Sequence, residues 1–141
     1  METLYEQDYG LWAEQMADLL AAGRFSELDI ENLVEEVRDL SKRERDRLLS
    51  SLRLITHHLL KWDHQPQKRS RSWQTTIQRE RLNIKKYLRD SPSLKRYLTD
   101  EYLHQVYETG RLDAIAETDL DMPIDCAYTI GDVLERDVVT T

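Results

Sequence analysis

The sequence predicts an all-α fold, a compact helical bundle of about five main helices followed by a short C-terminal helix. Glycine and proline are scarce, with four and three residues among 141, and most of them fall where helices are expected to end. Alternating β-branched runs, which are typical of strands, are almost absent, and apolar residues instead recur at helical spacing. A chain of this length is expected to form one domain, residues 1–141.

The N-terminal part of the chain predicts three helices. The first covers residues 4–22 and ends at Gly23, which suits the left-handed position after a helix. The second covers 29–40, and the third covers 42–62. Ser-Lys-Arg-Glu at 41–44 has the pattern of a capping box, so we expect a break or bend at Ser41, with one long helix as the alternative. The apolar stripe of the second helix consists of Ile30, Leu33, Val34, Val37 and Leu40.

Three further helices follow a polar connection. The fourth covers 72–89 and is capped by a serine at position 70 or 72. Ser91 and Pro92 have the pattern of the N-cap and first residue of a fifth helix. Apolar residues cover more than half of its circumference, which predicts a central position or an oligomer interface, and Gly110 is expected to kink it. Thr129 is expected to cap a last helix over 130–136.

Charge is divided into three blocks along the chain. Residues 1–41 hold 11 acidic and 2 basic residues, residues 42–96 hold 5 acidic and 16 basic, and residues 97–141 hold 11 acidic and 2 basic, for a net charge of −7. This division indicates that the basic centre either binds an anion or is neutralised by the acidic ends.

The composition also indicates a compartment. The single cysteine, Cys126, excludes an internal disulfide and favours a reducing environment. The N-terminus is acidic where a signal peptide needs a basic start, and no apolar run reaches the roughly 20 residues of a membrane span. We therefore expect a cytoplasmic protein without membrane contact.

The segment 59–94 reads LLKWDHQPQKRSRSWQTTIQRERLNIKKYLRDSPSL, and two earlier stretches, LYEQD from Leu4 and DIENL from Asp29, accompany it. In these stretches the sequence resembles a family of small bacterial proteins, many of them cyanobacterial, classed as domain-of-unknown-function family 29. Cys126 and Tyr128 lie where that family tends to have Cys-Pro-Tyr, and Ala127 departs from the pattern. The resemblance implies a helical fold and no particular reaction.

Candidate binding residues gather in the basic block, on the side of the fourth helix opposite its apolar stripe and in the connection before it. They could follow a phosphate backbone or meet a protein partner. The alternative is that they pair with acidic residues of the second helix or of the C-terminal block, within the chain or across an oligomer. The candidates are Lys68, Arg69, Arg71, Arg79, Lys85, Lys86 and Arg89.

Two structural features are predicted beside this cluster. Trp62 and Trp73 flank the connection that holds Pro66, and packing of a corner between helices is favoured over stacking on bases. Arg45 and Glu80 fall on the apolar stripes of the third and fourth helices, where a charge needs a partner. We predict that the two side chains are buried charges, and a pairing between them is one way to satisfy both.

Metal-binding patterns are weak. His57 and His58 are successive helical residues that point about 100° apart, although His64 and Asp63 are near. Glu101 and His104 form a single Glu-x-x-His, whereas a di-iron bundle needs two. We predict no metal, no cofactor and no catalytic residue.

Three functions remain open. The first is a non-catalytic protein-interaction or self-association module, with a protein partner or a homo-oligomer. The second is nucleic-acid binding through residues 68–96, and the third is a metal-assisted enzyme that uses His104 with Glu101 or the histidines of 57–64. The lack of a catalytic motif favours the first.

Overall fold

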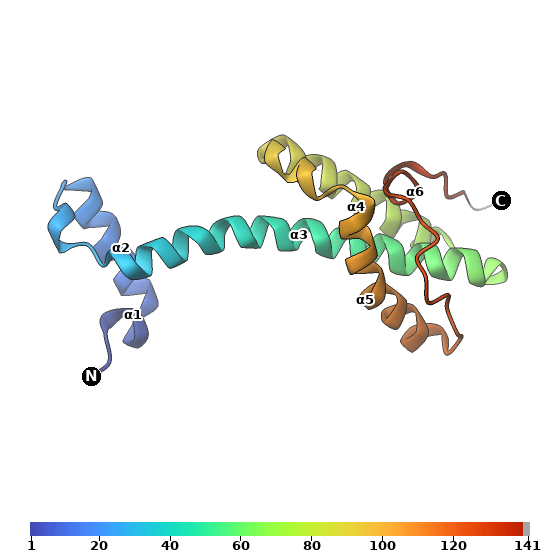
Figure 1. Cartoon of the computed structure of the whole chain (residues 1–141), viewed down its shortest axis with the longest axis horizontal. Helices are drawn as coiled ribbons and strands as arrows, with labels where there is room; N and C mark the ends of the chain where they lie inside the picture. The colour runs from blue at the N-terminus through green and yellow to red at the C-terminus, as the bar shows by residue number, and fades with distance from the viewer. Residues whose placement is uncertain (140–141) are drawn as a thin grey trace. The chain divides into compact units, whose positions relative to one another are not determined.

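The computed structural model describes residues 1–139, which are mostly helical and contain no strand in that range. The all-α class is therefore confirmed. The chain divides into two compact units, Met1–Lys42 and Arg43–Thr141, and that it forms one domain stays a prediction. The elements are α1 (Leu4–Gln7), α2 (Tyr9–Ala21), η1 (Phe25–Glu27), α3 (Ile30–His64), η2 (Pro66–Lys68), α4 (Arg71–Asp90), η3 (Pro92–Tyr97), α5 (Asp100–Thr118) and α6 (Ile130–Glu135), where η marks a 3₁₀ helix (Figure 1).

Helix α3 runs without interruption through Ser41, so the predicted break there is wrong. Residues 42–47 are Lys, Arg, Glu, Arg, Asp and Arg, all of which a helix interior accepts, and neither glycine nor proline stops it. Val37 and Leu48 are 11 residues apart, close to three turns, so the two apolar stripes are in register. A break at Ser41 would remove helical hydrogen bonds without improving the packing of either stripe.

Residues 4–21 form two helices, α1 and α2, where the sequence predicted one. Asp8 leaves the helical conformation, with φ −150° and ψ 87°, and its carboxylate accepts a hydrogen bond from the backbone N–H of Leu11. An aspartate that caps a new helix in this way ends the preceding one. Gly23 adopts φ 71°, which confirms its predicted position after the helix.

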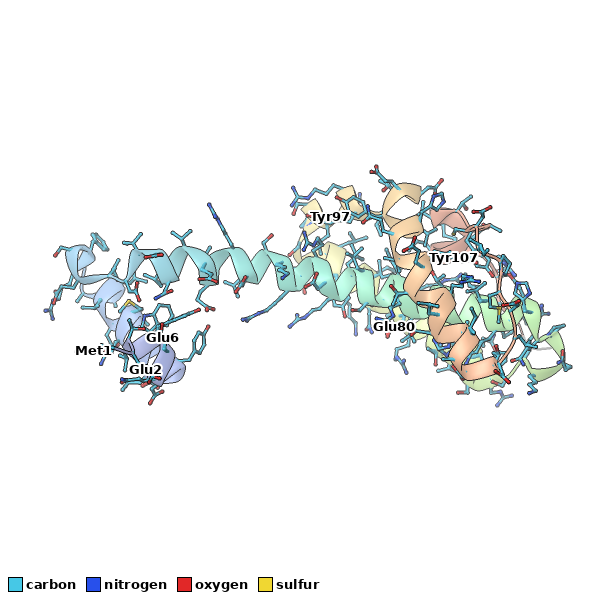
Figure 2. The ribbon with its side chains drawn as sticks, turned by 60° about the horizontal axis from the view of Figure 1, so that its bottom comes forward. Met1, Glu2, Glu6, Glu80, Tyr97 and Tyr107 are labelled. Atoms are coloured by element: carbon cyan, nitrogen blue, oxygen red, sulfur yellow. The ribbon has the colours of Figure 1, made fainter. Side chains whose placement is uncertain are left out.

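The core of the second unit forms around the C-terminal half of α3, with α4, α5 and α6 gathered against it (Figure 1). The side chains of this core are almost wholly buried, and Tyr107 of α5 is one of them (Figure 2). Its hydroxyl also donates a hydrogen bond of 2.5 Å to the carbonyl oxygen of Pro123. Its main members are Leu48, Leu52, Ile55 and Leu59 of α3, Ile77 and Ile84 of α4, Leu103 and Tyr107 of α5, and Val133 of α6.

Gly110 lies inside helix α5, which continues through it from Asp100 to Thr118. A Cβ atom at this position would lie 3.2 Å from the carbonyl oxygen of Arg53 and 3.3 Å from Cγ2 of Thr56. Glycine here therefore allows a close approach between α5 and α3, which is the physical reason for a small residue in a helix interior.

The start of the fifth helix also differs from the prediction. Pro92 opens the short 3₁₀ helix η3, and α5 begins at Asp100 with Thr99 as its N-cap, whose hydroxyl accepts from the N–H of Tyr102. By contrast, the predicted caps at Ser70 and Thr129 are confirmed, because both side chains accept a backbone N–H of their helices.

A charged clasp holds the C-terminal segment to the end of α3. Arg136 makes a two-pronged ion pair with the carboxylate of Asp63, and the hydroxyl of Tyr128 donates to the same carboxylate at 2.7 Å. Partial burial acts to raise the pKa of Asp63, but the hydrogen bonds from Arg136 and Tyr128 outweigh it and lower that pKa. The folded state is therefore stabilised by ionised Asp63.

The close approach at Gly110 predicts a position-specific loss of stability. Gly110→Val is expected to lower the free energy of unfolding by about 1–3 kcal/mol, because its methyl groups meet α3. In the control Gly10→Ala, the added Cβ has only the carboxylate of Asp8 within 4 Å, at 3.8 Å. That variant is expected to match or exceed the wild type in urea unfolding, and equal losses in both would contradict the close-approach argument.

The clasp predicts a pH dependence. Asp63 has a folded pKa below its ordinary value of 3.8, so its contribution is present above that pH and is lost as pH falls through the folded pKa. Asp63→Asn is expected to lower the free energy of unfolding by about 1–3 kcal/mol at neutral pH. The difference from wild type should shrink below pH 3.8, as urea unfolding at several pH values would reveal. The exposed Asp121, changed to Asn, serves as the control and should show no such difference.

Candidate interaction surfaces

The beginning of α3 carries an exposed row of aliphatic side chains, here called the N-terminal stripe: Ile30, Val34, Val37 and Leu40. Their exposed fractions are 56%, 43%, 63% and 58%. The same helical face is buried from Leu48 onward, because the helices of the second unit cover it there. Single exposed aliphatics are common on protein surfaces, but a contiguous row on one helix face is typical of an interaction site.

A shallow groove of about 330 Å³ lies on this stripe. Four of its five lining residues are aliphatic, and Arg38 is the fifth. The sequence could not separate this row from a core stripe, because both have the same residue types at the same spacing. In the sequence, this row is accompanied by the acidic character of the first unit, which has 11 acidic and 3 basic residues.

The other side of that part of α3 is tied to the preceding helices. Tyr5 and Tyr9 donate hydrogen bonds to the carboxylate of Glu36, and Nε1 of Trp12 donates to Asp29 at 3.1 Å. The hydrogen bond to Glu36 and burial raise the pKa of Tyr5 to about 12, so its hydroxyl remains a donor at neutral pH. These bonds orient α3 within the first unit and leave the N-terminal stripe uncovered.

The structure places all seven basic candidates at exposed positions of the second unit. Lys68 belongs to η2, Arg69 follows it, and the other five project from the solvent side of α4, around an exposed Leu82. We call these five the α4 basic face: Arg71, Arg79, Lys85, Lys86 and Arg89. Their spacing keeps them opposite the buried Ile77 and Ile84.

Few of these cations meet an acidic side chain. Arg79 lies 3.8 Å from Glu80, and Arg69 donates to the carbonyl oxygen of Trp62 at 2.8 Å. The remaining five make no ion pair with any residue that the structure describes. Within the second unit, no acidic side chain of the described residues therefore neutralises these five cations.

The corner between α3 and α4 is packed. Trp62 is 3% exposed, Trp73 is half-buried against the core, and Pro66 opens η2 between them. Each indole ring has a cation over it, since Arg69 lies 4.9 Å from the centroid of Trp62 and Lys61 lies 4.5 Å from that of Trp73. These contacts occupy ring faces that a base would need for stacking.

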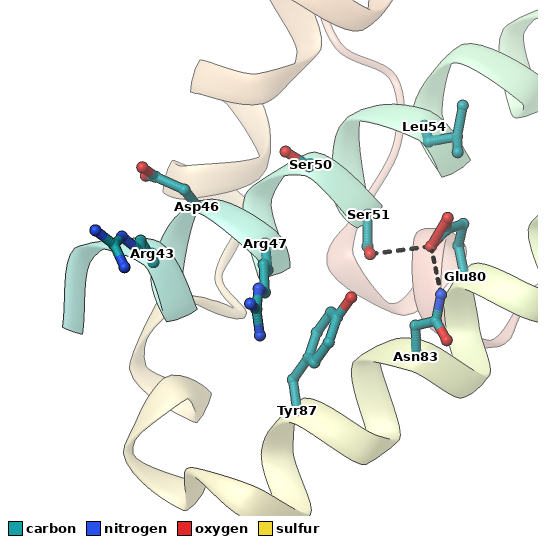
Figure 3. A pocket seen from close by; sticks show the side chains of 9 residues that line it. All are labelled: Arg43, Asp46, Arg47, Ser50, Ser51, Leu54, Glu80, Asn83 and Tyr87. Atoms are coloured by element: carbon teal, nitrogen blue, oxygen red, sulfur yellow. Dashed lines mark hydrogen bonds between the residues drawn. The ribbon is translucent and has the colours of Figure 1, made fainter. Parts of the chain in front are cut away.

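Glu80 is 13% exposed and lies in a polar cleft between α3 and α4 (Figure 3). Its carboxylate accepts hydrogen bonds from the hydroxyl of Ser51 at 3.1 Å and from the amide of Asn83 at 3.0 Å. The cleft has a volume of about 420 Å³. Its lining consists of Arg43, Asp46, Arg47, Ser50, Ser51, Leu54, Glu80, Asn83 and Tyr87.

The suggested pairing of Arg45 with Glu80 is wrong, because no hydrogen bond or ion pair joins them among the described residues. Arg45 lies 3.7 Å from the neighbouring Asp46, and its buried Nε has no hydrogen-bond partner in the part of the chain that is described. A neutral hydroxyl supplies the bond to Glu80 instead. The sequence did not indicate Ser51 as the partner of Glu80, since a small polar residue on an apolar stripe can serve many roles.

His57 and His58 have structural partners. His57 lies 2.6 Å from the carboxylate of Glu117, which also accepts from Lys61 at 2.7 Å, and both contacts join α3 to α5. Burial lowers the pKa of His58 to about 4, and its Nδ1 lies 3.0 Å from the carbonyl oxygen of Leu54. No group of three or more histidine, cysteine or carboxylate side chains that could hold a metal occurs in residues 1–139.

None of the described helices combines the length and the apolar character that crossing a membrane requires. These features define a small all-α protein with one apolar and one basic exposed helix face.

The sequence matches the family model "Domain of unknown function DUF29" over residues 4–139, and the chain therefore belongs to that family. The resemblance found in the sequence is thus confirmed over nearly the whole chain. Searches of curated proteins and of solved structures gave no significant match.

Proposed function

We propose that the chain is a non-catalytic protein-interaction module and that the N-terminal stripe packs against an apolar helix face of another polypeptide chain. The observation that carries this proposal is the change in exposure along α3, from Ile30 at 56% exposed to Leu48 at 0%. Amphipathic helices are stabilised when their apolar face is buried. Helix-in-groove recognition uses apolar anchors three or four residues apart, which is the spacing of Ile30, Val34 and Val37. That the protein acts in the bacterial cytoplasm stays a prediction.

The weakness of the first unit's own core supports the proposal. Among the described residues 1–42, only Trp12 and Met16 are buried. Chains below about 40 residues usually need a metal, a disulfide or association to be stable. A partner that covers the N-terminal stripe would supply the missing burial.

The free energy available also indicates the scale of the interface. Full burial of an aliphatic side chain contributes roughly 1.5–3 kcal/mol, so covering four that are about half exposed contributes roughly 3–6 kcal/mol. A complex of millimolar affinity has a binding free energy of about −4 kcal/mol, and association carries its own cost. The partner therefore contacts additional surface of the first unit, where Tyr9 and Leu20 are 49% and 48% exposed.

The test is a charge placed in the stripe. Val37→Glu is expected to weaken association at least tenfold, with a cost on the order of 2 kcal/mol for a central interface residue. Sedimentation velocity measures self-association, and titration calorimetry measures binding to any purified partner protein. The matched control is Leu112→Glu, which places the same charge at a residue of α5 that is 59% exposed. Equal effects of both variants would contradict the proposal.

A second candidate function is binding of a nucleic-acid backbone by the α4 basic face. The observation that favours it is the lack of ion pairs for Arg71, Lys85, Lys86 and Arg89 with the residues described. Cations fixed along one helix side release counterions when they contact successive phosphates. The packed Trp corner offers no stacking platform, so this binding would be electrostatic and insensitive to sequence.

The second candidate predicts a strong dependence on salt. Fluorescence anisotropy should detect binding to single- or double-stranded oligonucleotides at about 50 mM salt, and the affinity should fall steeply as salt is raised. Lys85→Glu combined with Lys86→Glu should abolish it, whereas Lys42→Glu, an exposed lysine of the first unit, should leave it nearly unchanged. No binding at low salt would rule out this candidate.

A further inference from the structure

The N-terminal stripe has two different borders. One border faces α1 and α2, where Glu36 and Asp29 accept the hydrogen bonds from the aromatic residues of those helices. The other border is open and carries Glu31 and Arg38, both exposed. These two side chains are seven residues apart, or about two turns, so they lie on the same side of the helix.

Neither of these border charges has an ion-pair or hydrogen-bond partner among residues 1–139. They have opposite signs and stand at the two ends of the same short stripe. A surface with this pattern is complementary to a copy of itself, provided that the copy runs in the opposite direction. In a parallel two-fold pair the open border of each copy would instead face the border of the other copy that carries Glu36 and Asp29, so Glu31 and Arg38 would not meet.

Resting on the proposed function, we infer that the occupant of the N-terminal stripe is a second copy of this chain, paired antiparallel about Val34. With the two-fold axis at Val34, Ile30 of each copy lies within about one residue rise of Val37 of the other. The same axis brings Glu31 of each copy opposite Arg38 of the other, within about one residue rise of 1.5 Å along the helix. One apolar row and two identical ion pairs then form a closed dimer.

The net charge of the first unit does not oppose this pairing strongly. The acidic residues Glu35 and Asp39 lie about 140° and 180° around the helix from Ile30, so they point away from the stripe and from the other copy. A basic amphipathic helix from a different protein would suit the 11 acidic and 3 basic residues of the unit as a whole. It would leave unexplained, however, why the open border itself carries one charge of each sign.

The thin core of the first unit also favours a second copy. Each chain exposes the same stripe and lacks the same burial, and a second copy is present wherever the protein is made. A dimer covers both stripes at once and exposes no new apolar surface, which is the advantage of a closed two-fold interface.

The experiment is a charge swap in the full chain, measured by sedimentation equilibrium up to about 100 μM protein. The wild type is expected to dimerise reversibly. Glu31→Arg alone and Arg38→Glu alone should each weaken the dimer about tenfold, because each replaces two attractive contacts by two repulsive ones. The double variant Glu31→Arg/Arg38→Glu should restore the wild-type dimer constant.

The control is Glu35→Arg, which makes the same charge change on the helix face turned away from the stripe and should leave the dimer constant within about twofold. A dimer that ignores the single variants, or that the double variant fails to restore, overturns the inferred arrangement. A monomeric wild type whose binding to another purified protein is lost in Val37→Glu overturns the second copy as occupant and leaves the proposed function standing. A monomer without any stripe-dependent binding overturns both.

Discussion

The burial of one face of α3 between Leu48 and Trp62 is the constraint on which the second unit depends. That face supplies fully buried side chains to which α4, α5 and α6 each add their own. The polar contacts follow from the same arrangement. Ser51 reaches Glu80 of α4, Lys61 reaches Glu117 of α5, and Asp63 receives Arg136 after α6. A shift of α3 along its axis would break these contacts together, because each comes from a different turn of one rigid helix.

The features predicted correctly from the sequence are those set by local chemistry. Gly23 takes a left-handed conformation and Ser70 and Thr129 cap helices, because each needs only its neighbouring residues to do so. Apolar spacing was equally informative about the buried stripes of α3 and α4. These features depend on residues only a few positions apart, so the residue types in a single sequence indicate them.

The errors came from choices that depend on residues far apart. The capping pattern at Ser41 is genuine, yet the continuous register of α3 outweighs it. Proline at 92 starts a 3₁₀ helix and Thr99 starts α5, two alternatives with similar local preference. The partner of Glu80 is a hydroxyl 29 positions earlier in the chain. In each case tertiary packing selected among locally acceptable options.

The α4 basic face and the N-terminal stripe differ in how strongly each supports a binding function. The α4 basic face is solvated and costs nothing when no partner is present, so its existence alone is weak support for a function. The N-terminal stripe differs, because an exposed helix that serves only to continue α3 would be as stable, and more soluble, with polar residues at positions 30, 34, 37 and 40. Four aliphatic side chains kept at these positions contribute free energy only when another surface covers them. The N-terminal stripe is therefore the stronger indication of a binding surface. Glu31 and Arg38, one heptad apart on its open border, restrict which partner surfaces can fit it.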